Sequence, residues 1–122
     1  MKLKNFNIQF GEQIFKSLAD PARIRILHLL YKNQELCISD LEHILDFTQT
    51  KTSRHISYLK NAGLLNSRKK DQWIFYQIKE EVHDIIRQIF RFLNKDPVLQ
   101  HDLETFEILN SNRELSINKI EL

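Results

Sequence analysis

The side chains best suited to chemistry in this chain lie within residues 48–58, and that chemistry is hydrogen bonding to nucleic acid. A Gln amide can form two hydrogen bonds to adenine, and an Arg guanidinium can do the same to guanine. Gln49 and Arg54 supply these two groups. The side chains beside them that can also reach bases or phosphates are Thr50, Lys51, Ser53, Ser57 and Tyr58. A helix through these residues presents a polar, basic face, as expected of a helix that lies in a DNA groove.

Two neighbouring features are suited to the DNA backbone. Thr48 and Gln49 stand at the expected start of this helix, where free amides and the helix dipole favour a phosphate. A charged turn follows about twenty residues later. Its phosphate-binding candidates are Arg68, Lys69, Lys70 and Gln72.

Positive charge is confined to the same part of the chain. Residues 48–79 hold seven Lys or Arg and one Asp, whereas residues 1–47 are neutral and residues 80–122 carry a net −4, giving +2 overall. Such a confined positive field is typical of a polyanion-binding face, although a solvated basic surface is the plainer alternative. A solvated helix usually mixes Glu with Lys, and no acid occurs between Lys51 and Lys70. The pattern therefore favours DNA binding.

The elements that would carry this face follow from periodicity and turn residues. A helix over residues 49–61 buries the stripe Thr52, Ile56 and Leu59, and Gly63 is placed for a left-handed cap. Residues 64–69 and 73–78 then predict two strands joined by a turn without glycine. Asp71 tolerates the left-handed conformation that this turn requires.

Further elements are expected before this region. Residues 6–18 form an apolar-faced helix, and Asp20–Pro21 starts the next one. Residues 34–38 can form one small strand. Ser39 and Glu42 have the spacing of a capping box, which predicts that a third helix begins at Ser39.

The C-terminal third is also predicted to be helical. Residues 80–94 have the most regular apolar spacing, and an Asp-Pro pair precedes another helix over 98–109. The polar tail from Ser111 is expected to fray. The predicted fold is mainly α with a small β-ribbon, in the order ααα-α-ββ-α-α. Residues 1–95 would form the core of one domain, with residues 96–122 as a helix and tail of the same domain.

Composition excludes several classes of protein. The chain has 122 residues, 42% hydrophobic and 28% charged, as in an ordinary globular domain. A single Cys excludes an intrachain disulfide and fits a reducing compartment. We expect neither a membrane span nor a secretory signal, and hence a cytoplasmic location. No catalytic triad, paired carboxylates or phosphate loop occurs, so neither an enzyme nor a bound cofactor is expected.

Four ordered motifs resemble the ArsR/SmtB family of winged helix-turn-helix repressors. They occupy residues 17–27, 35–41, 48–56 and 61–65, and the resemblance covers about residues 14–93. It implies a homodimer that represses an operator, a palindromic double-stranded DNA site, until an inducer releases it. The residues that match the family's DNA-reading positions are Thr48, Gln49, Thr50, Ser53, Arg54 and His55, with the wing at residues 68–72. His55 has the alternative role of packing between helices.

A homodimer is also favoured by the apolar faces of the helices predicted over residues 6–18 and 80–94. A chain of this length cannot easily bury both faces alone. The alternative is that both helices simply pack on the core. The residues expected at the dimer interface are Phe6, Phe10, Ile14, Val82, Ile86, Ile89, Phe90 and Leu93. Two-fold symmetry would place the two copies of the DNA-reading helix, residues 49–61, about 34–36 Å apart, on successive major grooves.

The resemblance also implies sensor sites, and the ligands for them are incomplete. The family's thiolate site needs two cysteines one residue apart, but Cys37 is followed by Ser39 at the second position. Thiophilic ions need several thiolates, so we expect no such metal at this site. Cys37 is interpreted as a small buried hydrophobe, with a redox switch as the alternative.

The family's second metal site is likewise incomplete. Glu81 and His83 resemble its first two ligands, but the later positions fall at Asn94 and Pro97, and proline has no ligand atom. A His83–His101 pair across a dimer remains an alternative. We therefore expect no bound metal, and the inducer is not identified. A different class of function, a winged-helix module that docks an acidic protein, also stays open.

Overall fold

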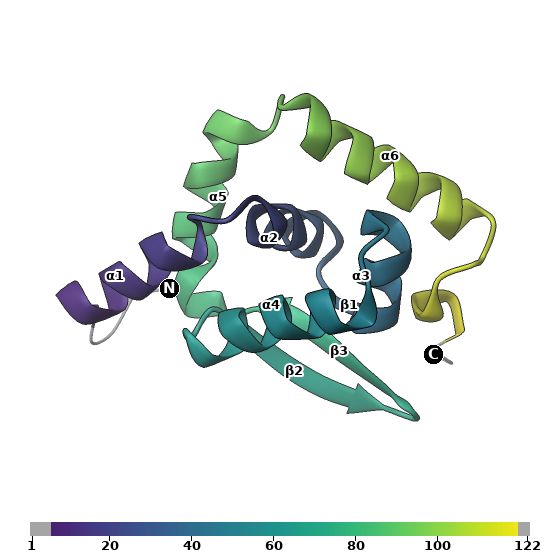
Figure 1. Cartoon of the computed structure of the whole chain (residues 1–122), viewed down its shortest axis with the longest axis horizontal. Coiled ribbons are helices and arrows are strands. Elements are labelled where there is room, and N and C mark those ends of the chain that lie inside the picture. Colours follow the sequence, from purple (N-terminus) through teal and green to yellow (C-terminus); the bar gives the residue numbers. More distant parts are fainter. Residues whose placement is uncertain (1–5, 120–122) are drawn as a thin grey trace.

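The computed structural model describes residues 6–119 as a mainly helical fold with one small sheet (Figure 1). This is the predicted fold class. The elements in order are α1 (Ile8–Ser17), α2 (Pro21–Asn33), β1 (Leu36–Cys37), α3 (Ile38–Leu45), α4 (Gln49–Asn61), β2 (Leu65–Lys70), β3 (Trp73–Ile78), α5 (Glu80–Leu93), α6 (Pro97–Ser111) and the 3-10 helix η1 (Ser116–Lys119). Within these residues no helix is both long and apolar enough to cross a membrane.

The sheet is antiparallel with the strand order β1-β3-β2. The predicted small strand is β1, which pairs Leu36 with Tyr76. β2 and β3 pair from Leu65 and Ile78 to Lys70 and Trp73, so only two residues form the turn between them. Asp71 has φ 56°, which confirms that it takes the left-handed conformation. An aspartate serves here because its short polar side chain tolerates this region.

α3 and α4 form the helix-turn-helix. Asp46 ends α3 with φ 57°, and the Phe47 amide then donates to the Glu42 carbonyl at 3.2 Å. The Thr48 hydroxyl caps α4 by accepting from the Lys51 amide at 3.1 Å. α4 spans the predicted residues, and Gly63 follows it with φ 90°, as expected for the cap.

Besides Thr48 of α4, two further predicted helix starts are confirmed and one is wrong. Asp20 and Asp96 cap α2 and α6, and each precedes a proline in the first turn. The capping box at Ser39 does not form: α3 begins at Ile38, and Cys37 occupies the cap position without a side-chain hydrogen bond. Because Cys37 ends β1, pairing with β3 sets the point where the chain turns into the helix.

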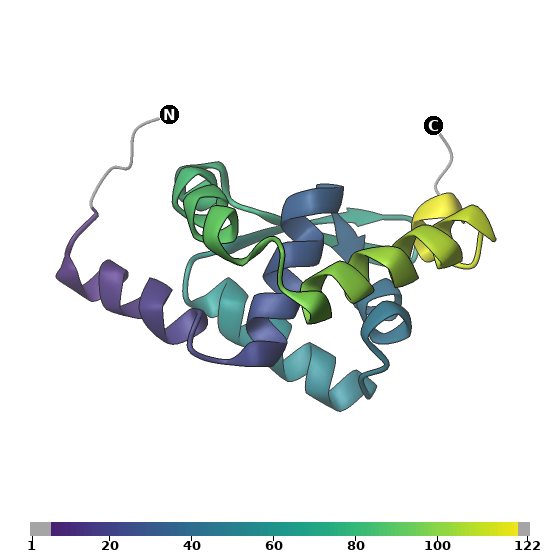
Figure 2. The same cartoon turned by 90° about the horizontal axis from the view of Figure 1, so that it is seen from above.

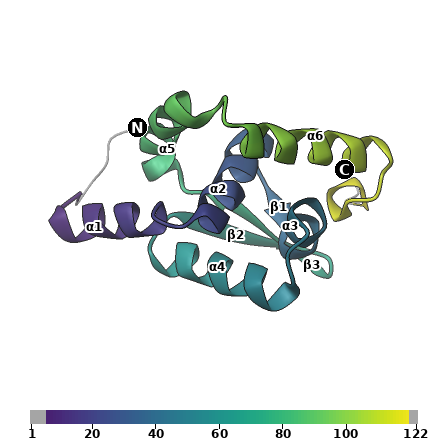
Figure 3. The same cartoon turned by 45° about the horizontal axis from the view of Figure 1, so that its top comes forward.

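α2 lies at the centre of the molecule, and its buried stretch from Ile26 to Leu30 contacts the surrounding helices. The ring of His28 packs edge-on against Phe90 of α5, with centroids 4.9 Å apart. α6 lies across α2 and α3, on the side away from α4 (Figure 3). Two hydrogen bonds of 2.9 Å join Arg25 of α2 to Asp102 of α6.

The described part of the tail after α6, residues 112–119, packs against α3 and β1, contrary to the predicted fraying. Leu115 and Ser116 are buried. The buried carboxylate of Asp40 in α3 accepts hydrogen bonds from the amides of Ser116 at 2.6 Å and Ile117 at 3.3 Å. These bonds join residues more than seventy positions apart, so no local pattern in the sequence indicates them.

Candidate nucleic-acid interface

α4 presents the predicted polar face to solvent. Thr52, Ile56 and Leu59 are buried as the helical stripe predicts. The exposed residues of the candidate face are Thr48, Gln49, Thr50, Arg54, Ser57 and Tyr58, and Lys51 and Ser53 are half-buried. One helix therefore displays amide, hydroxyl, guanidinium and ammonium groups together, the set that base edges and phosphates bind.

His55 does not belong to this exposed face. Its side chain is only 8% exposed. Burial lowers the pKa of His55, against the nearby charge of Asp20, and the cationic Arg23, Arg54 and Lys51 lower the pKa further. The alternative interpretation, a histidine that packs between helices, fits its position, and burial disfavours a contact of His55 with DNA.

Cation–aromatic contacts hold both ends of α4. At its start, the Lys51 ammonium lies 4.0 Å from the centroid of the Phe47 ring. Towards its end, the Arg23 guanidinium lies 4.1 Å from the centroid of Tyr58. Arg23 also donates to the Ser17 carbonyl at 3.0 Å, which ties the end of α1 to α4. Sequence reasoning missed Arg23, because nothing in its local pattern indicates a contact with Tyr58.

The β2–β3 wing lies beside α4. Lys69 and Gln72 are exposed and Lys70 is half-buried. The Lys60 ammonium of α4 contacts the Ser67 hydroxyl of β2 at 3.2 Å, which fixes the wing against the helix. Arg68 differs from the other predicted phosphate ligands, because its guanidinium forms an ion pair with Glu35. Its assignment to DNA is therefore not supported by this geometry.

Half of the predicted dimer contacts are core residues instead. Ile14, Val82, Ile86 and Phe90 are buried within the single chain, so they cannot form an exposed contact face. Their apolar periodicity is explained by packing on α2 and its neighbours. Phe10, Ile89 and Leu93 are half-buried and Phe6 is exposed.

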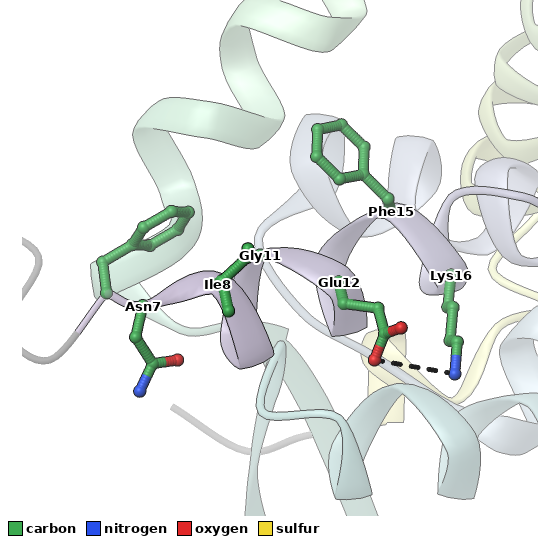
Figure 4. Close-up of a pocket in the computed structure, with 7 residues that line it drawn as sticks. Asn7, Ile8, Gly11, Glu12, Phe15 and Lys16 are labelled. Carbon is green, nitrogen blue, oxygen red and sulfur yellow. Dashed lines mark ion pairs between the residues drawn. The ribbon is translucent and has the colours of Figure 1, made fainter.

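The exposed apolar surface lies on other residues of the same two helices. Ile8 is 92% exposed, Phe15 72% and Phe92 88%. α1 projects from the body of the molecule (Figure 2). An open hollow of about 630 Å³ lies along α1, between residues that include Phe6, Ile8, Gly11 and Phe15 (Figure 4). Large apolar side chains at such exposure are typical of an interaction surface.

The potential sensor residues Cys37, His83 and His101 lie in three different elements, β1, α5 and α6. Among residues 6–119, no group of three or more His, Cys, Asp or Glu is placed to hold a metal ion. Cys37 is buried, and burial raises the pKa of its thiol, which disfavours the reactive thiolate. His83 lies against Tyr31 with ring centroids 5.6 Å apart, and His101 is exposed on α6.

Known proteins are similar to this chain in sequence and in fold. An arsenic resistance transcriptional regulator of Pseudomonas putida is 44% identical over 69 residues, which cover 57% of this chain and 54% of that relative. The chain thus spans about half the length of that protein. The solved structure of HlyU from Vibrio cholerae is 31% identical with a TM-score of 0.65, over 73% of this chain and 97% of that one.

A second solved structure shares the fold. The homodimeric winged helix-turn-helix DNA-binding domain from Mycobacterium bovis has a TM-score of 0.65 at 22% identity, over 72% of this chain and 82% of that one. Residues 20–67, from the cap of α2 into β2, match the profile of bacterial regulatory proteins of the arsR family. The chain belongs to the arsR family, whose members are transcription regulators rather than enzymes.

Proposed function

We propose that this protein is a sequence-specific DNA-binding repressor that binds a palindromic operator as a homodimer and leaves it when an inducer binds. One observation carries the proposal: the exposed face of α4 is polar and basic, and it stands beside an exposed cationic wing. The stretch of sequence from Lys51 to Lys70, which forms most of this surface, contains no acid and is suited to a polyanion.

In this proposal the two parts of the surface have different roles. Gln49 and Arg54, exposed in the first half of α4, contact base edges in the major groove and select the sequence. Lys51 and Lys69 bind phosphates, which adds affinity for any sequence and makes binding weaken steeply with salt. The contacts of Lys51 with Phe47 and of Tyr58 with Arg23 keep α4 oriented while it binds.

The homodimer is proposed from the apolar surface of α1 and α5. Ile8, Phe15 and Phe92 are too exposed to stabilise a single chain, and a second copy would cover them. The similar domain from Mycobacterium bovis is homodimeric. Two-fold symmetry would repeat α4 at about 34–36 Å, the spacing of successive major grooves.

The proposed inducer is a small molecule or a partner protein rather than a thiophilic ion. Although the Pseudomonas relative is named for arsenic resistance, Cys37 is the only cysteine here and its thiol is buried. Arsenite and cadmium require several thiolates. DNA affinity that is unchanged by EDTA and by added zinc would support this proposal, and a large effect of zinc would contradict it.

A competition experiment tests DNA binding against the docking of an acidic protein. A labelled duplex is bound to the protein and displaced either by unlabelled duplex or by a strongly acidic protein, at the same ionic strength. We expect displacement by DNA at far lower concentration. Equal displacement by the acidic protein would instead indicate an interaction module that recognises negative charge alone.

A further inference from the structure

Arg68 of the wing is held by a carboxylate from outside the wing. Its Nε donates to Glu35 Oε2 at 2.9 Å and its Nη2 donates to Oε1 at 2.5 Å. Glu35 immediately precedes β1, so the ion pair connects the two outer strands of the sheet across β3. The side chain of Glu35 is only 18% exposed, whereas that of Arg68 is 47% exposed. Glu35 raises the pKa of Arg68, in keeping with a two-pronged ion pair.

The direction of the Arg68 side chain also separates it from α4. Neighbouring residues of a strand point to opposite faces of the sheet. Ser67 contacts Lys60 of α4, so Ser67 and Lys69 share the face on the side of the recognition helix. Arg68 points to the other face, where its guanidinium lies 5.8 Å from the centroid of Phe75, the residue with which it pairs.

We propose that Glu35 is a specificity-determining residue that withholds Arg68 from DNA phosphates. This inference rests on the proposed DNA-binding function. A phosphate contact raises affinity for every sequence alike and carries no base information. Glu35 already accepts hydrogen bonds from Nε and Nη2 of Arg68 and pairs its positive charge. The wing therefore contributes fewer phosphate contacts, and a larger share of the binding free energy comes from the base contacts of α4.

The proposed role of the Glu35–Arg68 ion pair is tested by Glu35→Gln, which removes the negative charge and keeps the side-chain shape. The freed Arg68 gains a phosphate, so binding to a random duplex becomes tighter. The slope of log affinity against log salt becomes steeper by about 0.9 for each protomer. The ratio of operator affinity to random-duplex affinity falls. Fluorescence anisotropy over a series of salt concentrations measures all three quantities.

Three further variants make the test decisive. Arg68→Gln in the wild-type background leaves the salt slope unchanged, and in the Glu35→Gln background it restores the wild-type slope. Glu107→Gln removes the same charge from the exposed surface of α6 and leaves the slope unchanged. Thermal unfolding checks that each variant is folded.

Two results would overturn the inference. One is a loss of affinity in Arg68→Gln as large as that in Lys69→Gln, because Arg68 would then already contact DNA. The other is a Glu35→Gln protein whose slope is unchanged or whose gain persists after Arg68 is replaced. If the wild-type protein does not bind DNA at all, the proposed function fails instead, so the two failures are distinguishable.

Discussion

Burial divides the side chains of α4 between those that hold the helix and those that face solvent. Thr52 is buried and donates to the Thr48 carbonyl at 2.9 Å, whereas Gln49 and Arg54 are exposed. This division followed from the period of 3.6 residues alone. The inward position of His55 could not be predicted from this period. A histidine at the edge of the apolar stripe can face either the core or solvent, and only packing against neighbouring helices determines which.

The exposed pair on α4 leads to the first prediction. Gln49→Ala and Arg54→Ala each remove a side chain proposed to contact bases. Each is expected to cost about 1–3 kcal/mol of operator binding and to relax the preference at one base pair. Binding to a panel of duplexes, each with one operator position changed, measures both effects.

Lys69→Ala provides the contrast to these base-contacting residues. Loss of a phosphate ligand should weaken binding to every duplex by the same factor. Lys95→Ala, an equal change of charge in the turn between α5 and α6, is the matched control. Loss of affinity without any change in base preference in Arg54→Ala would exclude a base-reading role for that residue.

His28 leads to a prediction on stability against pH. It is buried beside Phe90, and neither ring nitrogen has a hydrogen-bond partner among the described residues. Burial lowers the pKa of His28, with a smaller contribution from the positive charge of Lys32 and against the charge of Asp102. The folded state therefore binds fewer protons than the unfolded state, whose histidine has a pKa near 6.5. Stability should fall as pH decreases below about 6.5.

His28→Leu removes this titration and should lose less stability than the wild type between pH 7.5 and pH 5.5. Urea unfolding at the two pH values measures the difference, and His43→Gln, at an exposed position, is the control. An identical loss in the wild type and in His28→Leu would show that other groups account for the acid sensitivity.

Among the secondary-structure elements, the helices and the wing were the most predictable part of the fold. Strong local signals, such as Asp-Pro starts and the left-handed Gly63, were confirmed. The start of α3 and the order of the tail were not predictable from local residues. In both cases a pairing between distant segments decides: β1 with β3, and Asp40 with the amides after α6.

The contact between α3 and the tail gives the third prediction. Asp40→Ala leaves the buried amide of Ser116 and the part-buried amide of Ile117 without their acceptor. An unsatisfied buried group costs about 1–3 kcal/mol, so the free energy of unfolding should decrease by that order. Hydrogen exchange should also accelerate at these two amides. Asp84→Asn, at an exposed position on α5, should leave exchange there unchanged, and the same unchanged exchange in Asp40→Ala would contradict the contact.

For the whole molecule, the apolar surface of α1 and α5 decides the proposed assembly. The sequence indicated apolar faces on these two helices, but half of the residues chosen for the interface are buried in the chain itself. Periodicity identifies an apolar face without showing whether a neighbouring helix or a second chain covers it. That Phe15 and Phe92 are largely exposed to solvent can be seen only from the packed arrangement of all the helices.

Substitutions on this surface give the fourth prediction. Phe15→Glu and Phe92→Glu place charges in the proposed interface and should convert a dimer to monomers in analytical ultracentrifugation. Operator affinity should fall sharply, because each monomer contacts a single half-site. Glu104→Gln on the exposed surface of α6 is expected to change neither property. A wild-type protein that sediments as a monomer at micromolar concentration would contradict the proposed assembly.

Sequence-specific DNA binding is the central claim, and a comparison of two duplexes tests it most directly. The wild-type protein is titrated into a duplex from its own promoter and into a scrambled duplex of equal length and composition, at about 150 mM salt. The account predicts binding to the promoter at least about a thousandfold tighter, the lower end of the range for specific regulators. Equal affinity for the two duplexes would contradict it.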